Sequence, residues 1–339
     1  MTEGRSRRPG PRIEEVARVA GVSKSTVSRV INGEKYVSER SRQAVHRAIA
    51  LLGYSPNHAA RTLAGSKANA IALVISEQGS RVLADPFFAG VLRGVHAELA
   101  GRHVQLLLMM NQPSDGAGQI AYLTGGHVDG ALVVSLHGED PLPRTLHETG
   151  LPIVVGGRPL AAGSFPFVDS DNFNGALEAV RHLISLGREK IATIAGPADM
   201  AVGMDRLSGW RCGLAEHGLA VKLVVHSDFT PEAGALAMEK LLGMAPDLDA
   251  VFVAADIMAL GAMMVLQARG YQIPGDVAVV GFDDSVVAAT AVPPLTTVRQ
   301  DVEQFGRTMT WRLLAELAGE EKLPLSILLP TSLVRRASA

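Results

Sequence analysis

The chain has 339 residues, of which 47% are hydrophobic and 19% charged, and its formal net charge is only −2. This length exceeds one ordinary domain, and the apolar content is sufficient for a large buried core. No apolar run approaches the roughly 18 residues of a membrane span, and the N-terminus lacks the apolar segment of a signal peptide. The single cysteine, Cys212, excludes an internal disulfide. We therefore expect a cytoplasmic protein with no membrane partner.

The small net charge hides a strong division of charge along the chain. Residues 1–67 contain 13 Lys and Arg against 5 Asp and Glu, whereas residues 68–339 contain 19 against 29. Phosphates attract a basic segment and repel an acidic one. The charge pattern therefore indicates a small head that binds nucleic acid, attached to a large body that does not.

Three short amphipathic helices are predicted in the basic head. Apolar residues at helical spacing predict a first helix over 13–20, which ends at Gly21, and a second over 24–31. A third helix is predicted from Ser38 to Gly53. Two helices joined by a tight turn with glycine predict a helix-turn-helix, whose second helix enters the major groove of DNA. A helical hairpin without function is the alternative, and the third helix and the basic charge argue against it.

The body alternates short β-rich segments with longer helical ones, and the series occurs twice. The predicted strands are 70–75, 104–109, 129–135, 152–155 and 167–169, and then 190–196, 221–225, 250–254 and 277–282. The predicted helices between them include 87–100, 115–126, 173–187, 204–218, 231–243 and 256–269. Such alternation predicts parallel sheets covered by helices on both faces, here in two similar subdomains. Ligands of open α/β sheets bind beyond the C-terminal ends of the strands, so the expected ligand site is the cleft between the subdomains.

The motifs of three common enzyme classes are absent from the sequence. It contains no G-x-x-x-x-G-K-[ST] phosphate loop, no G-x-S-x-G nucleophile turn and no H-E-x-x-H zinc motif. The 10 histidines lack the spacing of zinc ligands. We therefore expect no catalytic residue, no metal and no cofactor. A cytoplasmic sugar-metabolising enzyme is the alternative of another class.

The head carries a dense run of motifs. V-A-R-V-A-G-V-S-K-S-T-V-S-R-V-I-N-G (16–33) is followed by V-S (37–38) and by G-Y-S-P-N-H-A-A-R-T-L (53–63). This pattern resembles the DNA-binding head of lac-repressor-type (LacI/GalR) transcription regulators. The resemblance implies that Lys24, Ser25 and Arg29 contact bases. The residues that it places at phosphates are Ser23, Thr26, Ser28, Asn32, Tyr36 and Ser41.

Residues 57–64 resemble the hinge helix of the same family, which forms only on operator DNA. The resemblance places Asn57 and Ala60 at the DNA and Leu63 at a base step of the minor groove. An apolar side chain inserted there costs unstacking energy and bends the duplex, which gains further contacts. Ordinary packing within the hinge is the alternative for Leu63. The implied domains are the helix-turn-helix head 1–56, the hinge helix and linker 57–67, and an effector-binding core 68–339.

Runs in the body resemble the periplasmic-binding-protein-like core of this family. These runs are R-L-S-G-W (206–210), A-D-I-M-A-L-G (255–261), P-G-D-V-A-V-V-G-F-D-D (274–284) and P-P-L-T-T-V-R-Q-D (293–301). The resemblance implies an α/β core of two doubly wound parallel-sheet subdomains. Their expected extents are about 68–169 with 299–327, and about 170–298 with 328–339.

The same resemblance implies an effector site in the cleft. Arg206 and Asp283 match the family's principal effector contacts, and a guanidinium with a carboxylate suits a ligand that has several hydroxyls. Phe87 and Phe88 match the position of rings that stack on the ligand, with core packing as the alternative. The remaining predicted contacts are Arg158 and Asp171. A structural salt bridge is the alternative for these two.

The resemblance implies a repressor of carbohydrate-utilisation genes that a small sugar, a mono- or disaccharide, releases from its operator. The run S-L-H-G-E-D-P-L-P (135–143) is most similar to actinobacterial members that respond to cellobiose or other β-glucosides. Ala255, where many relatives have a polar residue, leaves the identity of the sugar open. The implied assembly is a homodimer on a pseudo-palindromic operator, and no heptad segment for a tetramer precedes Ala339. A regulator with a nucleobase or other metabolite as co-repressor is the alternative.

Overall fold

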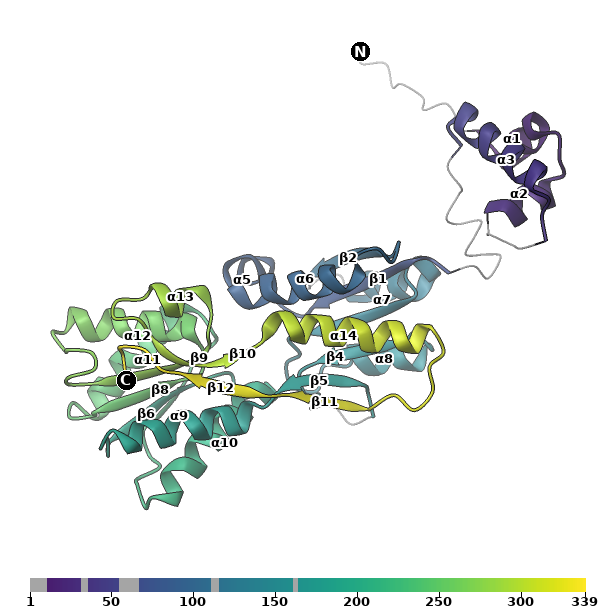
Figure 1. Cartoon of the computed structure of the whole chain (residues 1–339). Coiled ribbons are helices and arrows are strands. Elements are labelled where there is room, and N and C mark those ends of the chain that lie inside the picture. The colour runs from purple at the N-terminus through teal and green to yellow at the C-terminus, as the bar shows by residue number, and fades with distance from the viewer. Residues whose placement is uncertain (1–10, 32–35, 55–66, 111–115, 161–163) are drawn as a thin grey trace, which may run out of the picture. The chain divides into compact units, whose positions relative to one another are not determined.

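The computed structural model separates into two units, Met1–Ala68 and Asn69–Ala339 (Figure 1). It describes residues 11–31, 36–54, 67–110, 116–160 and 164–339. The predicted DNA contacts Asn32, Asn57, Ala60 and Leu63 lie outside these ranges. Within the described ranges, no helix is both long and apolar enough to cross a membrane.

Three helices form the described part of the first unit, and the predicted three-helix head is confirmed. They are α1 (Ile13–Ala20), α2 (Lys24–Ile31) and α3 (Glu39–Leu52). Val16, Val27 and Val45, one from each helix, have no exposed surface and form the centre of a small core. Gly21 ends α1 with a φ of 65°, a left-handed conformation that glycine adopts without strain. Ser38 caps α3 by accepting a backbone hydrogen bond.

Two six-stranded sheets form the second unit, with the strand orders β11-β5-β4-β3-β1-β2 and β12-β10-β9-β8-β6-β7 (Figure 1). The strands of the first sheet are β1 (Ala70–Ile75), β2 (Gln105–Met110), β3 (Gly130–Val134), β4 (Ile153–Gly156), β5 (Phe167–Ser170) and β11 (Ser326–Leu329). Those of the second are β6 (Ile191–Ala195), β7 (Val224–His226), β8 (Ala250–Val253), β9 (Ala278–Asp283), β10 (Thr296–Gln300) and β12 (Thr331–Val334). Neighbouring strands pair in parallel, except for the antiparallel pair of β10 and β12. The predicted pair of parallel-sheet subdomains is therefore confirmed.

Helices cover both faces of each sheet, as strand–helix alternation predicts. Subdomain 1, built on the first sheet, has α5 (Gly79–Ala84), α6 (Pro86–Leu99), α7 (Gly116–Tyr122), the π-helical turn η1 (Leu123–His127), α8 (Leu142–Glu148) and α14 (Val302–Leu317). Subdomain 2 has α9 (Asn172–Ser185), α10 (Ala201–Glu216), α11 (Pro231–Met244), α12 (Asp256–Ala268) and α13 (Val286–Thr290). On β1, Leu73 belongs to one buried cluster and Val74 to another, because successive side chains of a strand point to opposite faces.

The chain passes between the two subdomains three times, after β5, after β10 and between β11 and β12. After the second passage, α14 packs against α6 of subdomain 1. Glycines allow the two helices to cross closely. A Cβ at Gly94 would overlap the carbonyl oxygen of Glu303, and a Cβ at Gly306 would overlap that of Val91. The three passages join the subdomains along one side, and the cleft between them holds the cavity described below.

Candidate functional site

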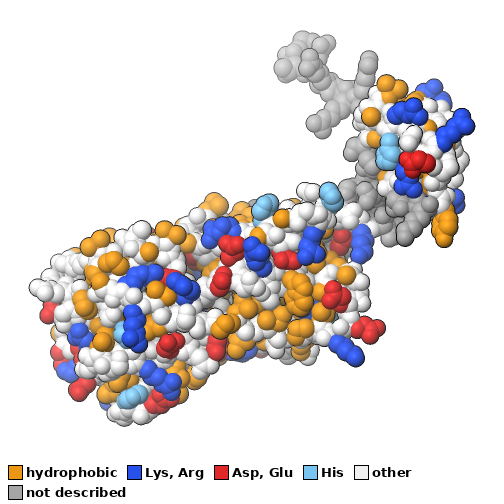
Figure 2. All heavy atoms as spheres, viewed as in Figure 1, with side chains coloured by type: hydrophobic (Ala, Val, Ile, Leu, Met, Phe, Trp, Pro, Cys, Tyr) orange, Lys and Arg blue, Asp and Glu red, His pale blue; other side chains and the backbone are white. Residues whose placement is uncertain are grey.

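The second helix of the head has one buried and one exposed face. Val27 and Val30 of α2 are buried in the head core, whereas Lys24, Ser28 and Arg29 are exposed. Figure 2 shows Lys and Arg side chains on the visible face of this unit. Cationic and hydroxyl side chains on one helix face can donate hydrogen bonds to base edges and phosphates. The arrangement is that expected of a recognition helix.

Two of the hydroxyl residues predicted to contact DNA, Ser23 and Ser41, lie at the N-terminal ends of α2 and α3. Ser23 Oγ accepts a 3.1 Å hydrogen bond from the backbone N of Thr26 and lies 2.8 Å from the Oγ of Ser25. Ser41 Oγ accepts a 2.9 Å hydrogen bond from the Oγ of Ser38. The ring of Tyr36 is 96% exposed. A tyrosine of this exposure is accessible to a partner.

A cavity lies between the two subdomains of the second unit and is lined from both. Its apolar walls include the rings of Phe87, Phe88, Phe229 and Phe305. The ionisable side chains that line it are Arg81, Asp85, Asp169, Arg206 and Asp283. A mostly apolar cavity with a few convergent polar groups is the usual form of a small-molecule site.

The two predicted phenylalanines differ in their environment. Both line the cavity, and their rings lie edge to face with centroids 5.4 Å apart. Phe88 is only 1% exposed and belongs to the core of subdomain 1. Phe88 therefore packs in the core, as the alternative interpretation expects, in addition to lining the cavity. Phe87, at the start of α6, is only partly buried. Part of the Phe87 ring is therefore accessible to a ligand in the cavity.

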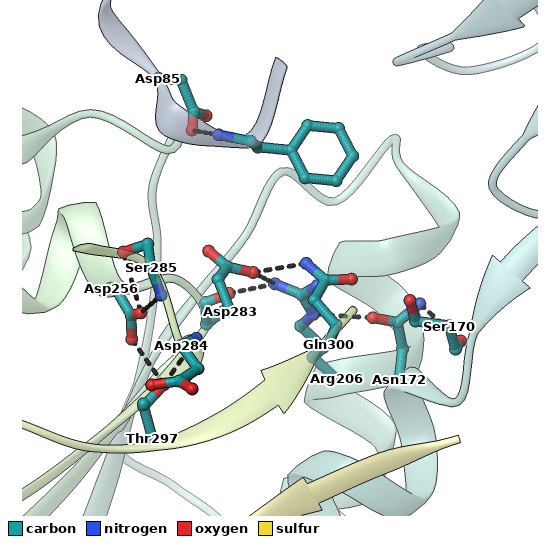
Figure 3. A network of polar contacts seen from close by, with 12 residues as sticks. Asp85, Ser170, Asn172, Arg206, Asp256, Asp283, Asp284, Ser285, Thr297 and Gln300 are labelled. Atoms are coloured by element: carbon teal, nitrogen blue, oxygen red, sulfur yellow. Dashed lines mark hydrogen bonds and ion pairs between the residues drawn. The ribbon is translucent and has the colours of Figure 1, made fainter. Parts of the chain in front are cut away.

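Arg206 is the centre of the polar network in the cavity (Figure 3). Its side chain is buried and donates to Asn172 Oδ1 at 2.9 Å, to the carbonyl oxygen of Ala254 at 2.5 Å and to Asp283 Oδ1 at 3.4 Å. The guanidinium also lies 3.6 Å from the ring centroid of Phe282. These contacts hold the guanidinium in one orientation, because its planar fork is bonded on several sides.

Asp283 ends β9 in an unusual backbone conformation and receives a second donor. Its φ of 119° lies in the region that favours glycine. Gln300, at the end of β10, donates to Asp283 Oδ1 at 2.6 Å. Loss of hydration in the protein interior raises the pKa of Asp283 to about 8, although the Arg206 guanidinium opposes this shift. A carboxyl group with this pKa can both donate to and accept from ligand hydroxyls near neutral pH.

A second carboxyl group, Asp256, supports the loop after β9. Asp256 accepts hydrogen bonds from Thr297 Oγ1 at 2.6 Å and from the backbone N and Oγ of Ser285 at 2.8 and 3.0 Å (Figure 3). Burial raises its pKa to about 6. Asp256 is not among the residues that line the cavity, and its hydrogen bonds join β10 and the start of α13 to the first residue of α12 (Asp256–Ala268).

The structure places the remaining two predicted effector contacts outside the lining of the cavity. Arg158 forms an ion pair across the cleft with Asp205 of α10, with 2.8 Å between the atoms. Asp171 caps α9 by accepting a hydrogen bond from the backbone N of Asn174. Both side chains follow strand ends, as the sequence indicates, but each has a partner within the protein.

Several cavity residues were not predicted from the sequence. Asn172 and Gln300 follow or end strands, so their position at strand ends is a signal that could have found them. Arg81 lies in α5 and Phe229 lies just before α11, and neither segment has a recognisable motif. The Arg81 guanidinium lies over the Phe229 ring only because the two subdomains close on each other. Both subdomains thus contribute hydrogen-bonding groups and phenyl rings to the cavity.

Comparison with known proteins agrees with this geometry. The model of the lacI family of bacterial regulatory proteins matches residues 12–57, and that of the periplasmic binding protein-like domain matches 180–339. The HTH-type transcriptional regulator CelR of Thermobifida fusca is 47% identical over 337 residues, which cover 98% of this chain and 99% of CelR.

Two solved structures are similar over nearly the whole chain. The complex of the transcriptional regulator CelR with cellobiose has a TM-score of 0.78 at 45% identity, and the match covers 97% of this chain and 100% of that one. The lac repressor dimer bound to operator and the anti-inducer ONPF has a TM-score of 0.84 at 27% identity, over 97% and 99% of the two chains. This chain is therefore a DNA-binding transcriptional regulator of the LacI family, and not an enzyme.

Proposed function

We propose that this regulator represses genes of carbohydrate use and leaves its operator when cellobiose or a related β-glucoside binds between its subdomains. The observation that supports this most is the cavity itself, in a chain that is 47% identical to the CelR of Thermobifida fusca and 45% identical to the CelR solved with cellobiose. Sugar rings have apolar faces that stack on aromatic rings and an edge of hydroxyls. Phe87 and Phe229 supply the first kind of contact, and Arg206 and Asp283 the second.

We further propose that the functional unit is a homodimer on a pseudo-palindromic operator. Two heads in flanking major grooves require two-fold symmetry of both protein and DNA. The similarity to the lac repressor dimer bound to operator supports this assembly. In the assembly proposed for this chain, residues 57–67 form the hinge, with Asn57, Ala60 and Leu63 at the minor groove. Since the operator is genomic DNA, we place this activity in the cytoplasm.

The two ligands oppose each other through the cleft. A sugar that contacts both walls of the cavity stabilises the arrangement in which the subdomains are close. If that arrangement disfavours operator binding, the operator must weaken sugar binding by the same factor, because coupling between two sites is reciprocal. Effector and operator thus compete without sharing a surface.

The test is selection of operator DNA from a random duplex library by the full-length protein, followed by fluorescence anisotropy with the selected duplex. We expect the selected sequences to contain two symmetric half-sites. Cellobiose should release the duplex, whereas glucose and lactose should do so only at much higher concentration. Tighter DNA binding in the presence of hypoxanthine or guanine, without a response to cellobiose, would instead support the co-repressor alternative.

A pair of matched variants tests the site. Asp283→Leu should keep operator binding and lose release by cellobiose, because leucine has a similar size but can neither donate to nor accept from a ligand hydroxyl in the cavity. Asp171→Asn is the control, since Asp171 lies outside the lining and asparagine also caps helices. Normal release with Asp283→Leu, or lost release with Asp171→Asn in a folded protein, would place the effector elsewhere.

A further inference from the structure

A histidine bridges the two subdomains at the cleft. His137, in the loop after β3, has its Nδ1 3.0 Å from Asp199 Oδ2, and Asp199 precedes α10 in subdomain 2. The backbone N of Gly138 also donates to the carbonyl oxygen of Asp199 at 2.6 Å. On its other side, His137 Nε2 lies 3.0 Å from Oε1 of Glu77, which follows β1 in subdomain 1. His137 therefore lies between one carboxylate of its own subdomain and one of the other.

This geometry requires a positively charged ring. A neutral imidazole has one N–H, whereas two ionised carboxylates can only accept, so both contacts form only when both ring nitrogens are protonated. The hydrogen bond to Glu77, followed by that to Asp199, raises the pKa of His137 against the opposing effect of burial. Although burial raises the pKa of Glu77, His137 and Arg81 lower it below its usual value. Glu77 is thus an ionised partner near neutral pH.

The bridge is connected to the cavity through Glu77. Besides His137, Glu77 accepts hydrogen bonds from Arg81 of α5 and, at 2.8 Å, from the Oγ of Ser135. Arg81 and Ser135 both line the cavity, and the Arg81 guanidinium lies 5.4 Å from the ring centroid of Phe229 in subdomain 2. The charged groups around His137 are therefore Glu77 and Arg81 of subdomain 1 and Asp199 of subdomain 2. Asp140, on the same loop as His137, is bonded to Ser76 at 3.3 Å.

A second bridge across the same cleft provides an internal comparison. Arg158, after β4, pairs with Asp205 of α10 at 2.8 Å. Both bridges place a cation of subdomain 1 against an aspartate of subdomain 2. They differ in one respect, because a guanidinium keeps its charge at all relevant pH values while an imidazolium loses its proton near neutrality.

We propose that His137 is a positioning residue for effector binding. Its ring bridges the closed cleft only when both ring nitrogens are protonated, so effector binding takes up a proton. This inference rests on the proposed function, in that the effector binds in the cavity and favours the closed cleft. When the cleft opens, Asp199 leaves with subdomain 2 and Glu77 stays. The ring then holds its proton less tightly than in the closed state.

The size of the effect follows from linkage. Across the whole titration of His137, effector affinity changes by the same factor by which Asp199 strengthens proton binding to the ring. The Asp199 side chain is 56% exposed and that of His137 36%. Contacts of this exposure change an equilibrium by up to about fivefold. We therefore expect cellobiose to bind up to about fivefold more tightly below the titration of His137 than above it.

The experiment is isothermal titration calorimetry of the full-length protein with cellobiose, in buffers of different ionisation enthalpy and over about pH 5.5 to 9. The wild type should take up a fraction of one proton on binding, and His137→Gln should lose this share. Asp205→Asn should weaken binding by a similar factor and leave proton uptake unchanged, because it breaks the bridge that does not titrate. Asp283 titrates in the same range, so each variant is compared with the wild type at every pH. Equal proton uptake in the wild type and His137→Gln would overturn the proposal.

A second measurement does not depend on cellobiose. With ¹³C-labelled histidine, the NMR titration of the resonance that disappears in His137→Gln gives the pKa of this ring directly. Asp199→Asn should lower that pKa, and an unchanged value would show that the bridge does not form in solution. If cellobiose fails to bind the wild type while Asp199→Asn lowers the pKa, the proposed effector is wrong and the bridge stands. If cellobiose binds without proton uptake although the bridge forms, the bridge is present in both states and the proposal fails.

Discussion

Arg206 offers the sharpest test of how the cavity is built. Arg206→Met keeps most of the apolar volume of the side chain and removes its charge and its five donors. It leaves Asn172 Oδ1 and the Ala254 carbonyl oxygen without the donor they have in the structure, and it leaves Asp283 Oδ1 with Gln300 as its donor. A buried acceptor left without its donor typically lowers the free energy of unfolding by about 1–3 kcal/mol. We expect a loss in this range for the second unit.

The loss should depend on pH in a defined direction. The pKa of Asp283 is raised from 3.8 to about 8 in the folded protein, so its carboxyl group makes stability fall as the pH rises between these values. Above about pH 8 this fall stops in the wild type, where the ionised carboxylate faces Arg206. Without Arg206 the pKa lies higher still, so the variant should keep losing about 1.4 kcal/mol per pH unit there.

The assay is urea unfolding followed by tryptophan fluorescence. Both tryptophans, Trp210 and Trp311, lie in the second unit, so the signal reports on that unit in the full-length protein. Measurements at pH 7 and about pH 9.5 give the two losses, and Arg206→Met combined with Asp283→Asn gives the coupling between the side chains. A loss below about 1 kcal/mol that is the same at both pH values would refute the reasoning. Operator binding should be unchanged in every variant that remains folded.

The other predictions concern the head, the hinge and the assembly. Arg29→Ala should weaken binding to the selected operator by about 1–3 kcal/mol and change binding to unrelated DNA much less, as measured by anisotropy at fixed salt. Leu63→Ala should reduce operator affinity and DNA bending in a gel-shift assay with permuted sites, and an unchanged bend would reject its insertion between base pairs. Sedimentation equilibrium without DNA should give twice the chain mass of 35.7 kDa, and a stable tetramer would contradict the dimer.

Local sequence pattern determined the elements and the class of the fold. The helices of the head follow from apolar residues at helical spacing and from Ser38, Gly21 and Gly53 at their ends, and all three are present. Buried runs such as 70–75 predict strands, because a strand covered on both faces is apolar throughout. The family's motifs indicate Arg206 and Asp283, and the place after the first core strand indicates Phe87; the structure puts all three on one cavity.

Only the tertiary structure decided which distant residues meet at the cleft. His137 is 60 positions from Glu77 and 62 from Asp199, and nothing in the periodicity around them indicates that the three form one bridge. The same holds for Arg158, for which the sequence left a ligand contact or a salt bridge open and which pairs with Asp205 in the structure. The spacing of apolar side chains indicates which face of a helix or strand is buried, whereas contacts across a cleft depend on strand order and on how two subdomains close. The sequence therefore identified the family of the protein, whereas the closing of the two subdomains on each other decided which residues line its ligand site.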